Sequence, residues 1–104
     1  MTTDAKEPLL DMAVLERVAP VIRNAAHPLR LRILDYLRRE GEPRNVTQIV
    51  EASGAGQAVV SQQLRILRDQ GLLSARRVGN FVLYDIANPS IFHLLECIRS
   101  HDNC

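Results

Sequence analysis

The stretch that decides the fold covers residues 47–86 and reads TQIVEASGAGQAVVSQQLRILRDQGLLSARRVGNFVLYDI. Apolar residues first recur at helical spacing, stop at the glycine-containing turn of residues 53–56, and resume over residues 57–70. Alternation with period two then begins on either side of Gly79-Asn80, a pair that favours a tight hairpin turn. This order predicts a helix-turn-helix followed by a two-strand wing.

The segments on either side of this motif predict further helices. The first covers about residues 9–26, and Pro20 is expected to kink it or to split it in two. The second begins at Pro28 and ends at Gly41, with Leu29, Ile33, Leu34 and Leu37 buried and Arg30, Arg38 and Arg39 facing outward. Thr47, or alternatively Asn45, is expected to cap the next helix, and a last helix runs from about Ser90 to the end.

The predicted architecture is therefore mainly α with a small β-hairpin. It is a winged helix-turn-helix of about five helices plus a two-strand wing. Residues 1–8 are expected to form a disordered leader, and residues 9–104 a single domain for DNA binding and dimerisation.

Composition excludes several classes of protein. The chain of 104 residues has no long apolar run and no signal-peptide pattern, which predicts a cytoplasmic protein without a membrane partner. Two cysteines are too few for a disulfide framework. No nucleophile–base pair and no phosphate-binding loop are recognisable, so the chain is not expected to be an enzyme.

Charge is unevenly distributed, although the net charge is only +1. Residues 1–20 carry a net charge of −2, residues 21–44 carry +3, and residues 55–87 carry +2. A nearly neutral chain with a basic face can still bind phosphates locally.

The predicted helix over residues 57–70 has the side chains that read DNA. Polar residues near the N-terminus of such a helix hydrogen-bond to base edges in the major groove, and arginines bind phosphates or enter the minor groove. We assign Gln57, Ser61 and Gln62 to base readout, Gln63 to a phosphate or base contact, and Arg65, Arg68, Arg76 and Arg77 to phosphates or a flanking minor groove. The alternative is a winged-helix protein-interaction module whose polar face is merely solvated.

Two segments resemble those of a known family. Residues 26–34, AHPLRLRIL, and residues 60–72, VSQQLRILRDQGL, resemble the second helix and the recognition helix of the ArsR/SmtB family of bacterial repressors. With the wing, the resemblance extends over roughly residues 10–100. It implies a homodimer built from the first and last helices, binding to an inverted-repeat operator in double-stranded DNA, and release by an inducer. Gln63 departs from the family pattern, because many members carry His there.

Dimerisation also has a physical argument. One recognition helix contacts few base pairs, whereas a two-fold dimer places two such helices about 34 Å apart, one turn of DNA. The apolar residues of segment 9–26, together with Ile91, Leu94, Leu95 and Ile98, would supply the shared surface.

The inducer site is predicted on the last helix. His93, Cys97, His101 and Cys104 lie four, four and three residues apart, close to one stripe of a helix. Imidazole and thiolate suit zinc, cadmium, copper(I) or a similarly soft ion. Arsenite is a narrower case, because the two cysteines are about 10.5 Å apart along an intact helix. Two such helices in a dimer would be able to complete a four-ligand set.

The resemblance implies other sites that fit this chain less well. A Cys-x-Cys metal site before the turn corresponds to Asn45-Val46-Thr47, which has no thiolate. A site on the last helix corresponds to Asn88, Ser90, His101 and Cys104, of which only the last two are good ligands. A thiol-based redox or persulfide response stays open, although the second helix has no cysteine. A purely structural role for His93, Cys97, His101 and Cys104 also stays open.

Overall fold

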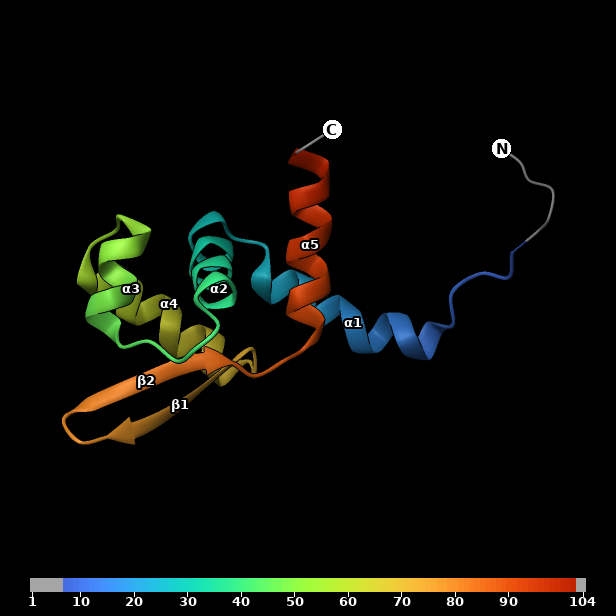
Figure 1. The fold of residues 1–104 in the computed structure, drawn as a ribbon. Coiled ribbons are helices and arrows are strands. Elements are labelled where there is room, and N and C mark those ends of the chain that lie inside the picture. Colours follow the sequence, from blue (N-terminus) through green and yellow to red (C-terminus); the bar gives the residue numbers. More distant parts are fainter. Residues whose placement is uncertain (1–6, 103–104) are drawn as a thin grey trace.

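The computed structural model describes residues 7–102, so most of the predicted leader lies outside the described range. Within that range the predicted winged helix-turn-helix is confirmed (Figure 1). Its elements are α1 (Met12–Ala25), α2 (Pro28–Glu40), α3 (Val46–Ser53), α4 (Gln57–Asp69), β1 (Leu73–Val78), β2 (Phe81–Ile86) and α5 (Ser90–Asp102). None of the described helices is long and apolar enough to span a membrane.

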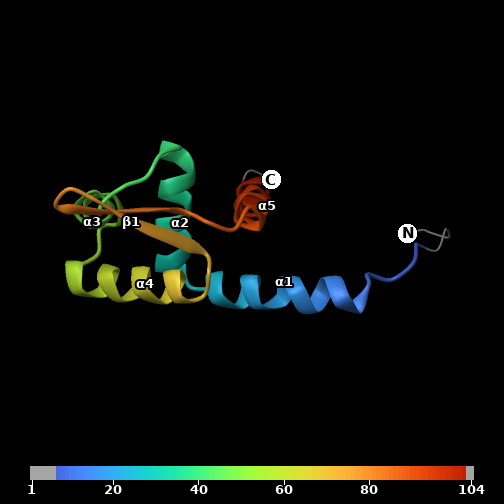
Figure 2. The same cartoon turned by 90° about the horizontal axis from the view of Figure 1, so that it is seen from below.

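The hydrophobic core lies between α2, α3 and α4, and α5 and the base of the wing close it. Its largest fully buried side chains are Ile33, Leu34, Leu37, Ile49, Val60, Leu64, Leu67, Leu72 and Ile91. The three of these from α4 recur at helical spacing, so one face of α4 is buried and the other is left for polar residues. Seen from below, α4 lies along one edge of the body (Figure 2).

Local sequence sets both ends of α3. The side chain of Asn45 accepts a hydrogen bond from the backbone N–H of Gln48 at 2.9 Å, and Gln48 Oε1 accepts one from the N–H of Asn45 at 2.9 Å. Thr47 as the cap is therefore wrong, because this reciprocal pair begins the helix earlier. Gly54 ends α3 with a φ of 77°, which favours glycine.

The wing is an antiparallel hairpin that is fastened to the body at its base. Its strands pair along their whole length and leave Gly79 and Asn80 as a two-residue turn. Of these two turn residues, only Gly79 has a positive φ, at 62°, as in turns with glycine at the first central position. Backbone hydrogen bonds of 3.0 and 2.8 Å join Arg44 and Tyr84, so the wing is held beside the segment that precedes α3.

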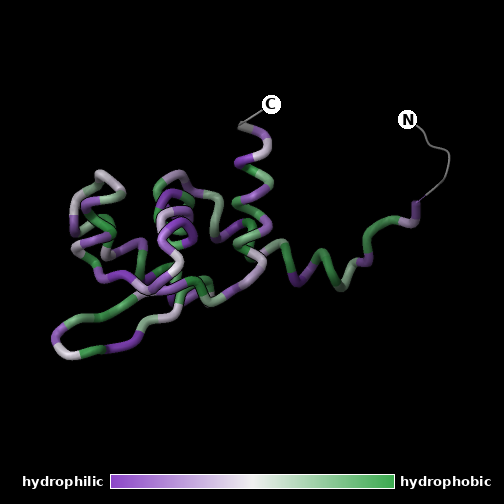
Figure 3. The backbone as a smooth tube through the Cα atoms, in the orientation of Figure 1, coloured by the Kyte–Doolittle hydropathy of each residue, from purple (hydrophilic) through white to green (hydrophobic). Residues whose placement is uncertain are grey.

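Helix α1 projects away from the packed body (Figures 1 and 2). It is one continuous helix, so of the two expected effects of Pro20, a kink or a division, the division is wrong. Pro20 removes the N–H that would bond to the carbonyl of Glu16, but both residues are exposed, so water can satisfy that carbonyl. Apolar segments continue along this projecting part of the chain (Figure 3), and its exposed large apolar side chains are Leu9, Leu10, Met12, Leu15 and Ile22.

Helix α5 divides its apolar residues between the core and the surface. Ile91 and Leu95 are buried, and Leu94 packs against the core. The assignment of Ile91 and Leu95 to an intersubunit surface is therefore wrong, because they close the core of their own chain, whereas Leu94 is only partly buried. Ile98 is 42% exposed and Phe92 is 43% exposed, so these two remain available to a partner.

Candidate nucleic-acid interface

The outward face of α4 carries a continuous polar and cationic surface. All but one of the α4 residues that are assigned a DNA contact are exposed. The exposed ones are Gln57, Ser61, Gln62, Arg65 and Arg68. Most of them border a shallow groove of about 380 Å³ between α4 and the wing, which is lined by Ala58, Ser61, Gln62, Arg65, Arg68 and Tyr84. The helix dipole and the free N–H groups of its first turn also favour an anion near Gln57.

Gln63 is the exception, and its predicted DNA contact is wrong. Its side chain is 8% exposed and turns toward α2, where Oε1 accepts a hydrogen bond of 2.6 Å from Nε of Arg30. Arg30 is likewise directed inward, contrary to the prediction that it faces solvent. The predictions for Gln63 and Arg30 are wrong for the same reason, because each of these polar side chains finds its hydrogen-bond partner in the other inside the molecule.

The two wing arginines lie on opposite faces of the hairpin. Arg76 and Arg77 are adjacent in β1 and both are exposed, and adjacent residues of a strand point in opposite directions. The register places Arg77 opposite Val82, on the face that also carries Tyr84 and looks toward α4. Arg76 lies on the other face, so the two guanidinium groups do not share one position relative to a ligand.

Pairing with acidic residues distinguishes Arg38, Arg39 and Arg44 from the arginines of α4 and the wing. Arg38 pairs with Asp35 at 2.9 Å, Arg39 with Glu40 at 2.7 Å, and Arg44 with Glu40 at 3.0 Å and Glu42 at 2.9 Å. Among the described residues, no ion pair is found for Arg65, Arg76 or Arg77, and Arg68 only approaches Asp69 at 4.0 Å. The arginines of α4 and the wing therefore keep positive charge available for an external anion.

Two further residues border this surface and were missed by the sequence analysis. A second groove, lined by Asn45, Val46, Thr47, Ser61, Asn80, Phe81, Val82 and Tyr84, joins the start of α3 to the wing. Tyr84 borders both grooves, although its place in an alternating strand suggests only a core or rim aromatic. Thr47 is exposed at the first turn of α3, and the signal for it is the helix-turn-helix itself, whose first helix crosses the DNA backbone.

The candidate inducer residues do not converge within one chain. His93, Cys97 and His101 are all exposed on α5, and Cys104 lies outside the described residues. Among residues 7–102, no group of three or more His, Cys, Asp or Glu side chains is placed to hold a metal ion. His93 and His101 are eight residues apart, about 12 Å along the helix, so one ion cannot bind both.

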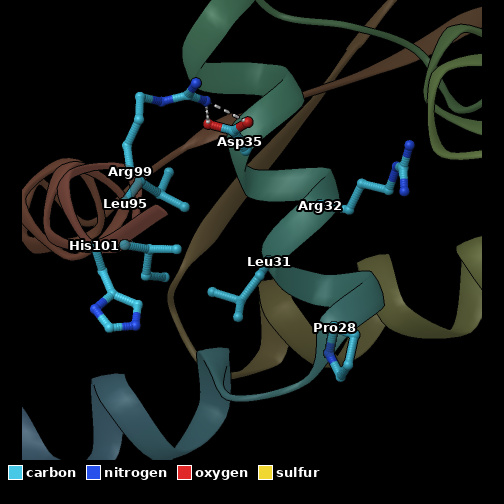
Figure 4. Close-up of a pocket in the computed structure, with 8 residues that line it drawn as sticks. Pro28, Leu31, Arg32, Asp35, Leu95, Arg99 and His101 are labelled. Carbon is cyan, nitrogen blue, oxygen red and sulfur yellow. Dashed lines mark hydrogen bonds and ion pairs between the residues drawn. The ribbon is translucent and has the colours of Figure 1, made fainter. Parts of the chain in front are cut away.

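His101 borders a groove of about 510 Å³ between α2 and α5 (Figure 4). Apolar side chains including Leu31, Leu95 and Ile98 line this groove, and Asp35 and Arg99 lie at its other end. Nη2 of Arg99 donates to both carboxylate oxygens of Asp35, at 2.8 and 2.7 Å. This contact fastens α5 to α2 beside the groove.

The carboxyl group of Asp35 is kept ionised by its neighbours. Partial burial raises its pKa, but hydrogen bonds from Arg99 and Arg38, together with their positive charges, outweigh this effect. The pKa of Asp35 therefore lies below its ordinary value, and the contact persists over the physiological pH range.

These features define a class, the winged helix-turn-helix with an exposed recognition surface. Residues 27–75 match the model of a family described as bacterial regulatory protein, arsR family. The transcriptional regulator NmtR of Mycobacterium tuberculosis is 38% identical over 87 residues, which cover 84% of this chain and 71% of NmtR. The chain therefore belongs to the arsR family, and the predicted resemblance is confirmed.

Solved structures agree with this assignment. The crystal structure of the AntR antimony-specific transcriptional repressor has a TM-score of 0.79 and 31% identity, and covers 95% of this chain and 91% of its own. A solution structure of a homodimeric winged helix-turn-helix DNA-binding domain from Mycobacterium bovis has a TM-score of 0.71 and 31% identity, and covers 96% of this chain and 91% of its own. These relatives are regulators, and the prediction that the chain is not an enzyme is confirmed.

Proposed function

We propose that this chain is a homodimeric, sequence-specific DNA-binding transcriptional repressor. The observation that carries the proposal is the division of α4 into two faces. Val60, Leu64 and Leu67 fill the core, while the polar and cationic residues of the opposite face are exposed beside a wing with two exposed arginines. A helix of this kind fits the major groove.

Each exposed residue has a role in this proposal. Gln57, Ser61 and Gln62 stand near the N-terminus of α4 and contact base edges. Arg65 and Arg68 bind phosphates along the groove. Arg77 on the inner face of the wing, and Arg76 on its outer face, bind phosphates or a flanking minor groove.

The proposed homodimer uses the apolar side chains that a single chain leaves exposed. Leu9 is 96% exposed and Leu10 is 71% exposed just before the projecting α1, and Phe92 and Ile98 are exposed on α5. Large apolar surfaces of this kind mark interaction sites. A two-fold pairing of α1 and α5 covers them and places two α4 helices on successive turns of an inverted repeat.

The first experiment measures DNA binding by fluorescence anisotropy, using a duplex from upstream of the chain's own gene and a scrambled duplex, at several salt concentrations. Wild type should prefer the first duplex. The double variant Arg76→Ala, Arg77→Ala should bind more weakly and show a shallower dependence of log K on log salt, by about one unit for each phosphate that is no longer neutralised.

The matched control is Arg38→Ala, Arg39→Ala, which removes the same charge from arginines that already pair with Asp35 and Glu40. It should leave the salt dependence unchanged. A wild-type protein that binds neither duplex at physiological salt contradicts the proposal and favours the interaction module.

For the inducer, we propose a thiophilic metal or metalloid ion bound at α5 by residues from both subunits. Support comes from the ligand types of His93, Cys97 and His101, from their exposure on a helix with uncovered apolar residues, and from a relative described as antimony-specific. Since these side chains do not converge within one chain, ligands from the partner would complete the set. The alternative is a thiol-based redox or persulfide response through Cys97 and Cys104.

The second experiment titrates the reduced protein anaerobically with zinc, cadmium, copper(I) and arsenite in turn, and follows thiolate charge-transfer absorption and release of DNA. The variants Cys97→Ser and Cys104→Ser should lose both signals. His27→Ala, at the start of α2, is the control and should keep them. Release by an oxidant or persulfide alone would instead support the alternative, and unchanged release in both cysteine variants would exclude both proposals.

A further inference from the structure

A chain of hydrogen bonds joins the recognition helix to the end of the projecting helix. Nε of Arg30 on α2 donates to Oε1 of Gln63 on α4 at 2.6 Å, and Nη1 of the same arginine donates to the carbonyl oxygen of Asn24 in the last turn of α1 at 3.2 Å. Nδ2 of Asn24 donates to Oε1 of Gln70, the residue that ends α4, at 3.1 Å. The last turn of α1 is thus connected to α4 at two points.

The arrangement of the helices gives these bonds a mechanical role. Figure 2 shows α1 and α4 roughly in line, with the C-terminal end of one beside the C-terminal end of the other. Apolar contacts along α2 hold α4 to the body but are not directional. A hydrogen bond to a charged donor fixes distance and angle.

Gln63 is buried on the opposite side of α4 from the residues assigned to DNA. A buried amide without a partner is costly, so this pair strongly favours one position of α4 relative to α2. The carbonyl oxygen of Asn24 accepts a hydrogen bond from the same guanidinium group of Arg30. Any rotation of α1 therefore displaces the group that holds α4.

We propose that Arg30, Gln63 and Asn24 form a clamp that fixes the orientation of the recognition helix relative to α1, and that Gln63 and Arg30 are positioning residues for DNA binding rather than DNA contacts. The inference rests on the proposed DNA-binding function and deepens it. With α1 in the dimer interface, the clamp sets the separation of the two recognition helices.

The test uses Gln63→Met and Arg30→Met, which keep the length of the side chain and remove the hydrogen bond, together with the double variant. Each single variant should remain folded and dimeric but bind operator DNA about tenfold more weakly, within the range typical of coupling between sites. The double variant should be no weaker than Arg30→Met alone, because Arg30→Met already removes the bond that Gln63→Met removes. Gln63→Glu keeps the acceptor and should restore most of the affinity.

The salt dependence of DNA binding distinguishes a positioning residue from one that contacts a phosphate. Arg30→Met should leave the slope of log K against log salt unchanged, whereas removal of a phosphate-binding charge makes it shallower. Arg39→Met is the matched control, since it removes the same charge from the same helix where Arg39 bonds only to its neighbour Glu40 and stacks on Tyr36. It should leave affinity unchanged. Independent, additive losses, or a shallower slope for Arg30→Met, would overturn the clamp.

A measurement without DNA keeps the inference testable if the proposed function fails. Amide hydrogen exchange of the free dimer should quicken in residues 57–70 in both single variants, and should stay as in wild type in β1 and β2. Unchanged exchange in α4 would contradict the clamp, whatever the DNA measurements show.

Discussion

At the scale of single residues, burial decides which polar side chains are free to act. Gln62 and Gln63 are neighbours of the same type, yet Gln62 is exposed and Gln63 is 8% exposed with a partner on α2. For the arginines, partners count as well as burial. Part-buried Arg30 bonds to Gln63 and exposed Arg39 bonds to Glu40, whereas Arg65 has no ion pair among the described residues. Position on the helix therefore carries more information about function than residue type does.

Asp35 gives a prediction at this scale. Its pKa is lowered in the folded chain, so the ion pairs with Arg99 and Arg38 contribute stability above the ordinary pKa of an aspartate, about 4, and lose it as pH falls through the folded value. Asp35→Asn should lower the free energy of unfolding at pH 7 by about 1 kcal/mol or less, since the pair is partly exposed. Urea unfolding at pH 7 and below pH 4 measures this.

The difference between Asp35→Asn and wild type should shrink at the lower pH. Asp69→Asn is the control, because Asp69 is 60% exposed and only approaches Arg68. A difference that stays constant with pH would show that the loss of stability comes from packing rather than from the charge.

At the scale of elements, the capping of α3 gives a second prediction. Asn45→Ala removes the acceptor for the N–H of Gln48 and should lower the free energy of unfolding by about 1 kcal/mol. Thr47→Ala, two residues further on, should change it by less than about 0.5 kcal/mol. Urea denaturation of both variants decides between the two caps, and a larger loss for Thr47→Ala would contradict the assignment to Asn45.

The elements themselves were predictable because each has a local cause. Helical spacing placed Val60, Leu64 and Leu67 in the core, and Gly79-Asn80 placed the turn of the wing. The errors concern contacts between segments distant in sequence. Nothing near Gln63 indicates that Arg30, thirty-three residues away, occupies its amide, and nothing near Ile91 indicates that it completes the core of its own chain.

The candidate site was predictable to a similar extent. The exposed face of α4 follows from periodicity, since it is what remains after the buried stripe is assigned. Tyr84 and Thr47 were missed because they come from other elements and meet Ser61 only where the wing folds back on the helices. Tertiary arrangement, rather than local pattern, brings such residues together.

At the scale of the whole molecule, the prediction concerns self-association. Ile98→Glu places a charge on the exposed apolar face of α5, where pairing with a second copy would bury it without a partner, and should weaken the dimer at least about tenfold. Val78→Glu on the wing is a matched control, since Val78 is 44% exposed and Ile98 is 42% exposed. Sedimentation at a series of micromolar concentrations measures both.

Dimers that persist unchanged in Ile98→Glu would exclude this face of α5 from the interface. Loss of dimers in Val78→Glu as well would point to a general effect of added charge. The expected pattern is dissociation of the first variant alone, and that variant should also lose the preference for an inverted repeat over a single half-site, because the preference comes from two linked binding events.

The meeting of α1 and α4 at their C-terminal ends has an electrostatic consequence. Each helix carries a partial negative charge there, so two such ends brought together repel one another. The guanidinium group of Arg30 bonds to the last-turn carbonyl of Asn24 and brings positive charge to this junction. Without this guanidinium group, two ends of like partial charge would face one another with nothing positive between them.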